Sequence, residues 1–180
     1  MATKPSYVEL ISEFWPNIQV QSSSGPFDYA AIQLIDPTQT LPTQAELDSK
    51  SLYSLRKTIW KEIQARRDYR KGAGVKIGAN WFHSDDTSRI QQLALTMMGA
   101  NIPAGINWKT MQGTFVVMTP TLASQMFQTI AGSDQAIFSK AEFHRQTMIG
   151  LTEPELYDYT TGWAMIYEES PECAALVDYQ

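Results

Sequence analysis

The longest regular pattern of apolar positions follows Thr43 and predicts a long helix. Thr43 and Glu46 lie three residues apart and form a capping box, which starts a helix. Apolar side chains then recur every three to five residues along one helical stripe: Leu47, Leu52, Leu55, Ile59 and Ile63. At 1.5 Å per residue, such a helix is ~40 Å long. Because one small core cannot cover that length, we expect Leu52, Leu55 and Ile59 to bind another chain or the N-terminal segment.

Shorter patterns predict further helices and small hairpins. A capping box at Ser6 and Glu9 starts a short helix, which Pro16 ends. Gly113 supplies the positive φ that a tight turn needs between two apolar runs. Helices are expected at residues 7–14, 43–71, 87–98, 120–131 and 134–149, and strands at 27–35, 75–77, 80–82, 108–111 and 114–118. The fold class is therefore α+β: mainly helical, with small β-hairpins and one long connecting helix.

Two of these helices have apolar positions that define a face. In the helix at residues 120–131, Met126, Phe127 and Ile130 are expected to face inward. After Thr87, four apolar positions recur at helical spacing and define the face of the next helix: Ile90, Leu93, Ala94 and Met97.

Composition narrows the class of protein. The chain has 180 residues, 43% of them apolar, which suits one ordinary domain with a small appendage. No apolar run approaches the ~18 residues of a membrane span, and the N-terminus lacks the pattern of a secretory signal, so no membrane partner is expected. Cys173 is the only cysteine, so the chain forms no internal disulfide.

Charge is distributed unevenly along a chain whose net charge is −5. All 14 Lys and Arg residues precede residue 151, and eight of them lie between Arg56 and Lys76. A basic stripe of this kind either binds nucleic acid or forms a solvated helix face. The acidic overall balance argues against nucleic acid, so we favour the solvated face.

The stretch ANWFHSDDTSRIQQL, residues 79–93, contains several residues of the types that bind metals or act in catalysis. His83 with Asp85 and Asp86 could hold a metal, and His83 beside a serine could form a base and nucleophile. Adjacent side chains in a turn rarely converge on one ion, however, and the chain has no G-x-S-x-G, H-E-x-x-H or Gly-rich phosphate motif. The structural interpretation is that Asp85 or Asp86 caps a helix and Arg89 pairs with one of them. We favour this interpretation, with no metal, no cofactor and no catalytic residue.

The same stretch carries a family resemblance. GVKIGANWFHSDDTSRIQQL, with IWKEIQARRDYR before it and INWKTMQGTFVVMTPTLASQM after it, resembles an uncharacterised domain common in tailed bacteriophages. The shared pattern is F-x-[ST]-D-x-x-S followed by W-x-x-x-x-G, and it covers about residues 52–149. The matching residues are Arg66, Arg67, Gly78, Phe82, Ser84, Asp85, Ser88, Trp108, Gly113 and Thr119.

A second resemblance divides the chain into three parts. Residues 1–50 resemble XkdW-like phage tail proteins, on the basis of short matching runs: Phe14-Trp15-Pro16, Phe27 and Tyr29, and Pro42-Thr43 with Glu46-Leu47. Residues 51–150 form the phage tail-associated helical domain. Residues 151–180 are an acidic, aromatic extension without a recognisable relative.

Both resemblances imply a protein encoded among tail and tail-fibre genes. The preferred function is a non-enzymatic tail-fibre assembly protein, a chaperone that binds the fibre tip. A small structural component of the virion tail or fibre is the close alternative, and a metal-dependent hydrolase centred on His83 is the distant one. The implied partner is a tail or tail-fibre protein, including a trimeric fibre. The implied location is the host cytoplasm during phage assembly, or the virion tail.

The extension at residues 151–180 leaves two alternatives open. It carries seven acids and no base, together with several aromatic rings: Tyr157, Tyr159, Trp163, Tyr167 and Tyr179. Rings that anchor and carboxylates that steer are typical of an interface with a basic partner. Alternatively, the segment folds back on its own domain, with its acids facing the basic helix near Arg66 to Lys71. Deletion of the segment leaves a folded protein under the first alternative and an insoluble one under the second.

Overall fold

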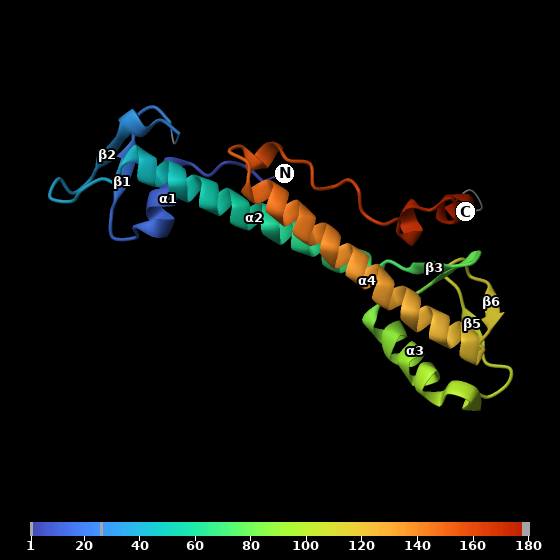
Figure 1. The fold of residues 1–180 in the computed structure, drawn as a ribbon. Coiled ribbons are helices and arrows are strands. Elements are labelled where there is room, and N and C mark those ends of the chain that lie inside the picture. Colours follow the sequence, from blue (N-terminus) through green and yellow to red (C-terminus); the bar gives the residue numbers. More distant parts are fainter. Residues whose placement is uncertain (1, 26, 178–180) are drawn as a thin grey trace. The chain divides into compact units, whose positions relative to one another are not determined.

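The computed structural model describes residues 2–25 and 27–177, which form two compact units. Unit 1 comprises Met1–Ile63 and His144–Tyr159, and unit 2 comprises Gln64–Phe143 and Thr160–Gln180. Two long helices, α2 (Gln44–Gly72) and α4 (Pro120–Ile149), contribute residues to both units (Figure 1). Each unit has a hydrophobic core of its own. Asp178 and Tyr179, which belong to the acidic and aromatic extension, lie outside the described residues.

Unit 1 is built on the first half of α2. Helix α1 (Tyr7–Phe14) begins at the predicted capping box, where the Ser6 N–H donates to Glu9 Oε2 over 2.8 Å and the Glu9 N–H donates to Ser6 Oγ over 3.2 Å. The short 3₁₀-helix η3 (Pro154–Leu156) also belongs to this unit. The core joins α1 to β2 (Ile32–Leu34) and α2 through five buried side chains: Tyr7, Leu10, Ile11, Ile32 and Leu47.

The strand predicted at residues 27–35 is largely wrong. A 3₁₀-helix, η1 (Tyr29–Ala31), occupies its middle, because the Asp28 carboxylate accepts a hydrogen bond from the Ala30 N–H over 3.0 Å. Only β2 (Ile32–Leu34) is extended. It pairs antiparallel with β1 (Val20–Ser22), a strand that the sequence pattern did not predict. A side chain that satisfies its own neighbouring backbone thus competes with extended structure here.

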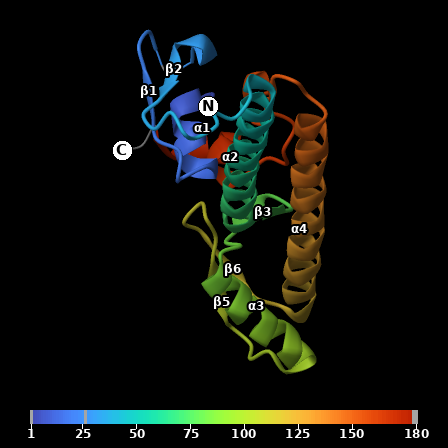
Figure 2. The same ribbon diagram turned by 90° about the vertical axis from the view of Figure 1, so that its left-hand side faces the viewer.

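Unit 2 packs two hairpins and two helices around a second core. Strands β3 (Val75–Ile77) and β4 (Asn80–Phe82) form the predicted first hairpin, and β5 (Asn107–Lys109) and β6 (Phe115–Val117) form the second. Helix α3 (Asp86–Met98) lies beside the N-terminal half of α4 (Figure 2). The buried core residues are Val75, Phe82, Leu95, Met118, Ala123, Met126 and Ile130. Three shorter helices complete the unit: η2 (Gly99–Asn101), η4 (Tyr167–Glu169) and α5 (Pro171–Val177).

Helix α4 runs through the break that the sequence predicted between residues 131 and 134. A glycine inside a helix costs ~1 kcal/mol relative to alanine, and Gly132 is tolerated here because α4 buries Ile130 before it and Ile137 after it. Asp134, expected near the start of a new helix, instead binds a side chain of α3. The α+β, mainly helical class with small hairpins is confirmed.

Candidate protein-interaction site

The aspartate at the centre of the 79–93 stretch is a helix cap. Asp85 precedes α3, and its Oδ1 accepts a hydrogen bond from the Ser88 N–H over 3.0 Å, while its Oδ2 accepts one from the Ser88 hydroxyl over 2.7 Å. These bonds favour the charged carboxylate and lower the pKa of Asp85 below its usual range. Between the two candidates that the sequence offered, Asp85 is the cap and Asp86 occupies the first turn.

Ser84, one residue earlier, ties the end of α2 to the first hairpin. Its buried hydroxyl donates to the Lys71 carbonyl over 2.7 Å and accepts from the Gly74 N–H over 2.9 Å. Phe82 is fully buried in the core of unit 2. The serine and phenylalanine of the F-x-[ST]-D-x-x-S pattern are therefore held by the scaffold.

Arg89 does not pair with Asp85 or Asp86, and that prediction is wrong. Its guanidinium binds both carboxylate oxygens of Asp134 on α4, over 2.6 and 2.9 Å, and also donates to the Lys71 carbonyl over 2.8 Å. Asp85 is already occupied by Ser88, and the arginine is long enough to reach across to the next helix. Arg89 thus joins α3 to the end of α2 and to α4.

The two histidines have structural surroundings of different kinds. His83 offers its backbone carbonyl to the Gln92 amide over 2.8 Å. His144 is buried in unit 1, with its Nδ1 2.7 Å from the Tyr157 hydroxyl. Within residues 2–25 and 27–177, no group of three or more His, Cys, Asp or Glu side chains is placed to hold a metal ion. The absence of a cofactor or metal in the living protein stays a prediction.

The second half of the phage-like pattern forms the second hairpin. Trp108 on β5 faces Val116 on β6 and packs against the core of unit 2. Gly113 adopts the predicted positive φ, +84°, in the connecting turn. These residues of the phage-like pattern therefore stabilise the fold of unit 2.

An apolar groove lies between α3 and α4 of unit 2. It has a volume of about 350 Å³, with Ile90 and Leu93 on one wall and Phe127 on the other. These three side chains are 70%, 45% and 48% exposed. At one end, Arg89 and Asp134 neutralise each other, so the groove presents mainly apolar surface.

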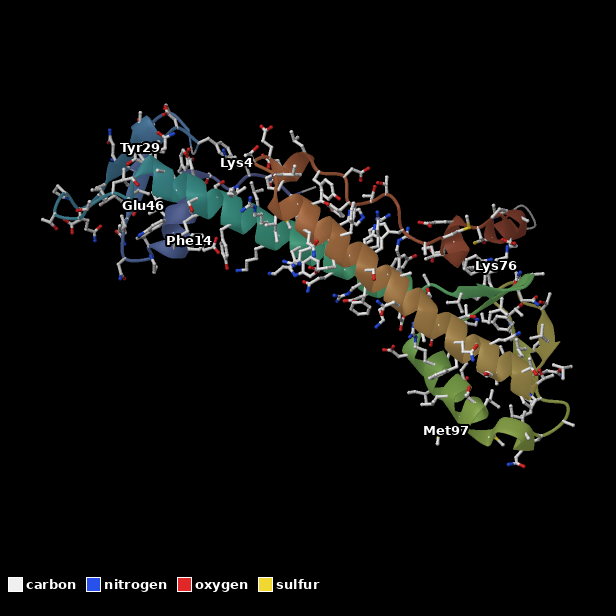
Figure 3. The ribbon with its side chains drawn as sticks, in the orientation of Figure 1. Lys4, Phe14, Tyr29, Glu46, Lys76 and Met97 are labelled. Atoms are coloured by element: carbon white, nitrogen blue, oxygen red, sulfur yellow. The ribbon has the colours of Figure 1, made fainter. Side chains whose placement is uncertain are left out.

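The orientation of α3 explains why this surface is exposed. Gln92 and Leu95 are buried, and Thr96 donates to the Gln92 and Ala123 carbonyls over 2.9 and 3.3 Å. These anchors turn the predicted apolar face outward, and Met97 on it is 81% exposed (Figure 3). Phe127, expected in the core, is also half exposed, whereas Met126 and Ile130 are buried as predicted. In the sequence, this exposed apolar surface was indicated by apolar positions around α3 that outnumber those one buried face requires.

Comparison with protein families decides the classification. Residues 54–161, more than half of the chain, match the model of a domain of unknown function, DUF4376. The chain belongs to the DUF4376 family. Comparisons with curated proteins and with solved structures gave no match. The DUF4376 region overlaps residues 52–149, on which the resemblance to a phage domain rests, but its description names no function, so the phage assignment stays a prediction.

The structure corrects the partner-binding role that the sequence predicted for Leu55 and Ile59 of α2. Leu55 and Ile59 are 4% and 1% exposed, so the chain itself covers them and they offer no surface to a partner. Leu55 also borders a hollow together with Pro5 of the N-terminal segment, which was the other alternative. Leu52 is half-buried, and its role stays a prediction.

The aromatic rings near the end of the DUF4376 region make contacts inside unit 1. Tyr157 contacts His144, and the Tyr159 hydroxyl donates to Glu62 Oε2 over 2.5 Å. Both rings are half-buried. Their hydroxyls therefore have partners within the chain, which weakens the prediction that they anchor another protein.

Beyond the DUF4376 region, residues 164–173 fold back on unit 2. Tyr167 is buried, with its ring centroid 5.9 Å from that of Trp81. Glu169 forms an ion pair with Arg70, and Glu172 pairs with Lys76 over 2.5 Å. Trp163 lies 5.9 Å from the Arg70 guanidinium. The structure therefore supports the fold-back alternative for this part of the extension and contradicts a partner-binding role for Tyr167.

The cap at Asp85 gives a first testable prediction. Replacing Asp85 with alanine should lower the free energy of unfolding by about 1 kcal/mol, because the Ser88 N–H loses its acceptor. Since the folded-state pKa of Asp85 is lowered, this stabilisation is complete above the unfolded-state pKa of ~4 and is lost as pH falls through the folded-state pKa. Urea unfolding followed by circular dichroism measures this loss of stability, at one pH above the unfolded-state pKa and at one pH below the folded-state pKa.

The matched control for this prediction is Asp86→Ala, which removes an exposed first-turn charge but no cap. It should cost less than the Asp85 substitution. EDTA should leave the melting temperature unchanged. A fall of several degrees with EDTA would reinstate the metal alternative at His83.

Proposed function

We propose that this chain is a non-enzymatic assembly protein of a bacteriophage tail fibre, and that it binds an apolar segment of the fibre in the groove between α3 and α4. The phage assignment rests on the resemblance of residues 52–149. The binding assignment rests on one observation: the groove exposes Ile90, Leu93 and Phe127 on two adjacent helices.

The physical case for a protein partner is the cost of this exposure. Fully burying an isoleucine, leucine or phenylalanine side chain contributes roughly 1.5–3 kcal/mol. Covering several of them in one groove supplies a hot spot of the size that dominates protein interfaces. Because Arg89 and Asp134 are paired, the groove favours an apolar segment over a charged one.

The test is co-expression of the chain with the tail-fibre protein of the same phage. Wild-type protein should co-purify with the fibre and raise the yield of trimeric fibre. Leu93→Asp should abolish both effects, since it places a charge in the apolar groove. Gln91→Asp adds the same charge at an exposed position of α3 outside the groove, and it should behave as wild type. Equal co-purification of the two variants would refute the assignment of the groove.

Mass spectrometry of purified virions separates an assembly protein from a structural tail component. An assembly protein acts before the virion is complete, so its peptides should be absent from purified particles. Recovery of the chain in a fixed ratio to the fibre would instead establish the structural alternative.

A further inference from the structure

Unit 1 carries a second groove whose lining is cationic. It lies between α2 and the C-terminal end of α4 and has a volume of about 420 Å³. Three of the side chains that line it are Arg56, Lys57 and Arg145, and no carboxylate is among the described residues of the lining. Arg56 and Lys57 therefore place positive charge at this groove in a chain whose net charge is −5, whereas Arg145 has interactions of its own within the chain.

Two of the cations are held in place by the chain. Arg56 donates from Nη2 to the Leu151 carbonyl over 3.0 Å, and the Arg145 guanidinium lies 5.9 Å from the Trp60 ring. Arg56 Nε is buried without a hydrogen-bond partner among the described residues. Lys57 is exposed at the rim. A groove with fixed cations loses little conformational entropy when an anion binds.

The floor of the groove is apolar. Met148 is 1% exposed, Ile149 is 42% exposed, and Tyr53 is 55% exposed at the edge. A small inorganic anion has no apolar part that could bury this floor. It fits an anionic group that is attached to an apolar body, because the cations then steer and the floor anchors.

We propose that this groove binds an acidic segment of a partner protein, in which carboxylates flank a leucine or aromatic side chain. The proposal rests on charge complementarity and is independent of the proposed fibre function, because it concerns different residues in a different unit. Nucleic acid shares the negative charge but not the flanking carboxylates and aliphatic side chain, and it is an outcome of the test below.

The experiment measures fluorescence anisotropy of a labelled peptide in which glutamates flank a central leucine and tryptophan. The full chain should bind it saturably, with an affinity that falls as salt rises. Lys57→Glu should weaken binding at least about tenfold, because it reverses a charge at the rim. Lys109→Glu makes the same charge change at an exposed position of unit 2 and should leave the affinity unchanged. A peptide with alanines in place of leucine and tryptophan should bind more weakly.

Three results would overturn the proposal. They are no saturable binding of the peptide, equal loss of affinity in Lys57→Glu and Lys109→Glu, or tighter Lys57-dependent binding of duplex DNA than of the peptide. Leu93→Asp should bind the peptide as wild type does. A negative result with the peptide would therefore not count against fibre binding in the α3–α4 groove. A negative result with the fibre would likewise not count against peptide binding in this groove.

Discussion

Deleting residues 160–180 should destabilise unit 2 by roughly 3–6 kcal/mol, since burial of each large apolar side chain contributes roughly 1.5–3 kcal/mol. Ile166 and Tyr167 are 4% and 8% exposed, and they leave with the deleted segment. Trp81, only 2% exposed, loses its neighbour. A loss of this size is a large fraction of the 5–15 kcal/mol that stabilises a typical domain.

Differential scanning calorimetry and binding of a hydrophobic dye measure the effect of this deletion. The truncated protein should melt at a lower temperature and bind more dye than the full chain. Tyr167→Phe is the matched control, because it keeps the buried ring and removes only a hydroxyl without a hydrogen-bond partner among the described residues. A truncated protein as stable as the full chain would mean that the segment does not fold back, and the interface alternative would return.

Replacing Arg89 with methionine should cost about 2–3 kcal/mol, because it removes charge-assisted bonds to the Lys71 and Ser84 carbonyls and leaves Asp134 unpaired. Both side chains of this pair are about three-quarters buried, with exposures of 23% and 25%. The Arg89→Met, Asp134→Leu double variant should recover part of the loss, since no unpaired carboxylate remains. Urea unfolding of the single and double variants gives the coupling energy.

An exposed carboxylate on α2 provides the comparison for Arg89. Asp68 binds the adjacent Arg67, and the Asp68 side chain is 58% exposed. Asp68→Asn should therefore cost less than about 1 kcal/mol. If Arg89→Met costs no more than Asp68→Asn, the role of Arg89 in joining α3 to α4 is wrong.

Features that depend on neighbouring residues were predictable from the sequence. The capping boxes at Ser6 and Thr43, the Asp85 cap and the turn at Gly113 are all formed by residues within a few positions of one another. Local hydrogen bonds and positive φ angles decide them, and the sequence shows both directly.

Features that depend on tertiary packing were not predictable in the same way. The partner of Arg89 lies 45 residues away, so spacing along α3 could not reveal it. The face that α3 buries is set by Gln92 and Thr96, which donate hydrogen bonds to the His83 and Ala123 carbonyls respectively. A hydrophobic pattern would instead place both of these polar side chains in solvent. The apolar groove follows from that choice, which is why the candidate site could be found only in the structure.

The basic helix shows how a charge pattern becomes specific in three dimensions. The sequence suggested one solvated stripe from Arg56 to Lys76. In the structure, Arg70 and Lys76 pair with Glu169 and Glu172 of unit 2. Lys76 lowers the pKa of Glu172 to about 2, so this contact is complete above pH ~5 and is lost as pH falls toward that value. Arg56 and Lys57 instead line the cationic groove of unit 1.

The central claim is that the α3–α4 groove binds the tail fibre, and the affinity of the purified chain for purified fibre tests it most directly. Isothermal titration calorimetry should show saturable binding by wild type and by Gln91→Asp, with a negative heat-capacity change from burial of apolar surface. Leu93→Asp should bind at least about tenfold more weakly, since one buried side chain contributes at least ~1.4 kcal/mol. Equal affinities for all three proteins, or no binding by wild type, would contradict the account.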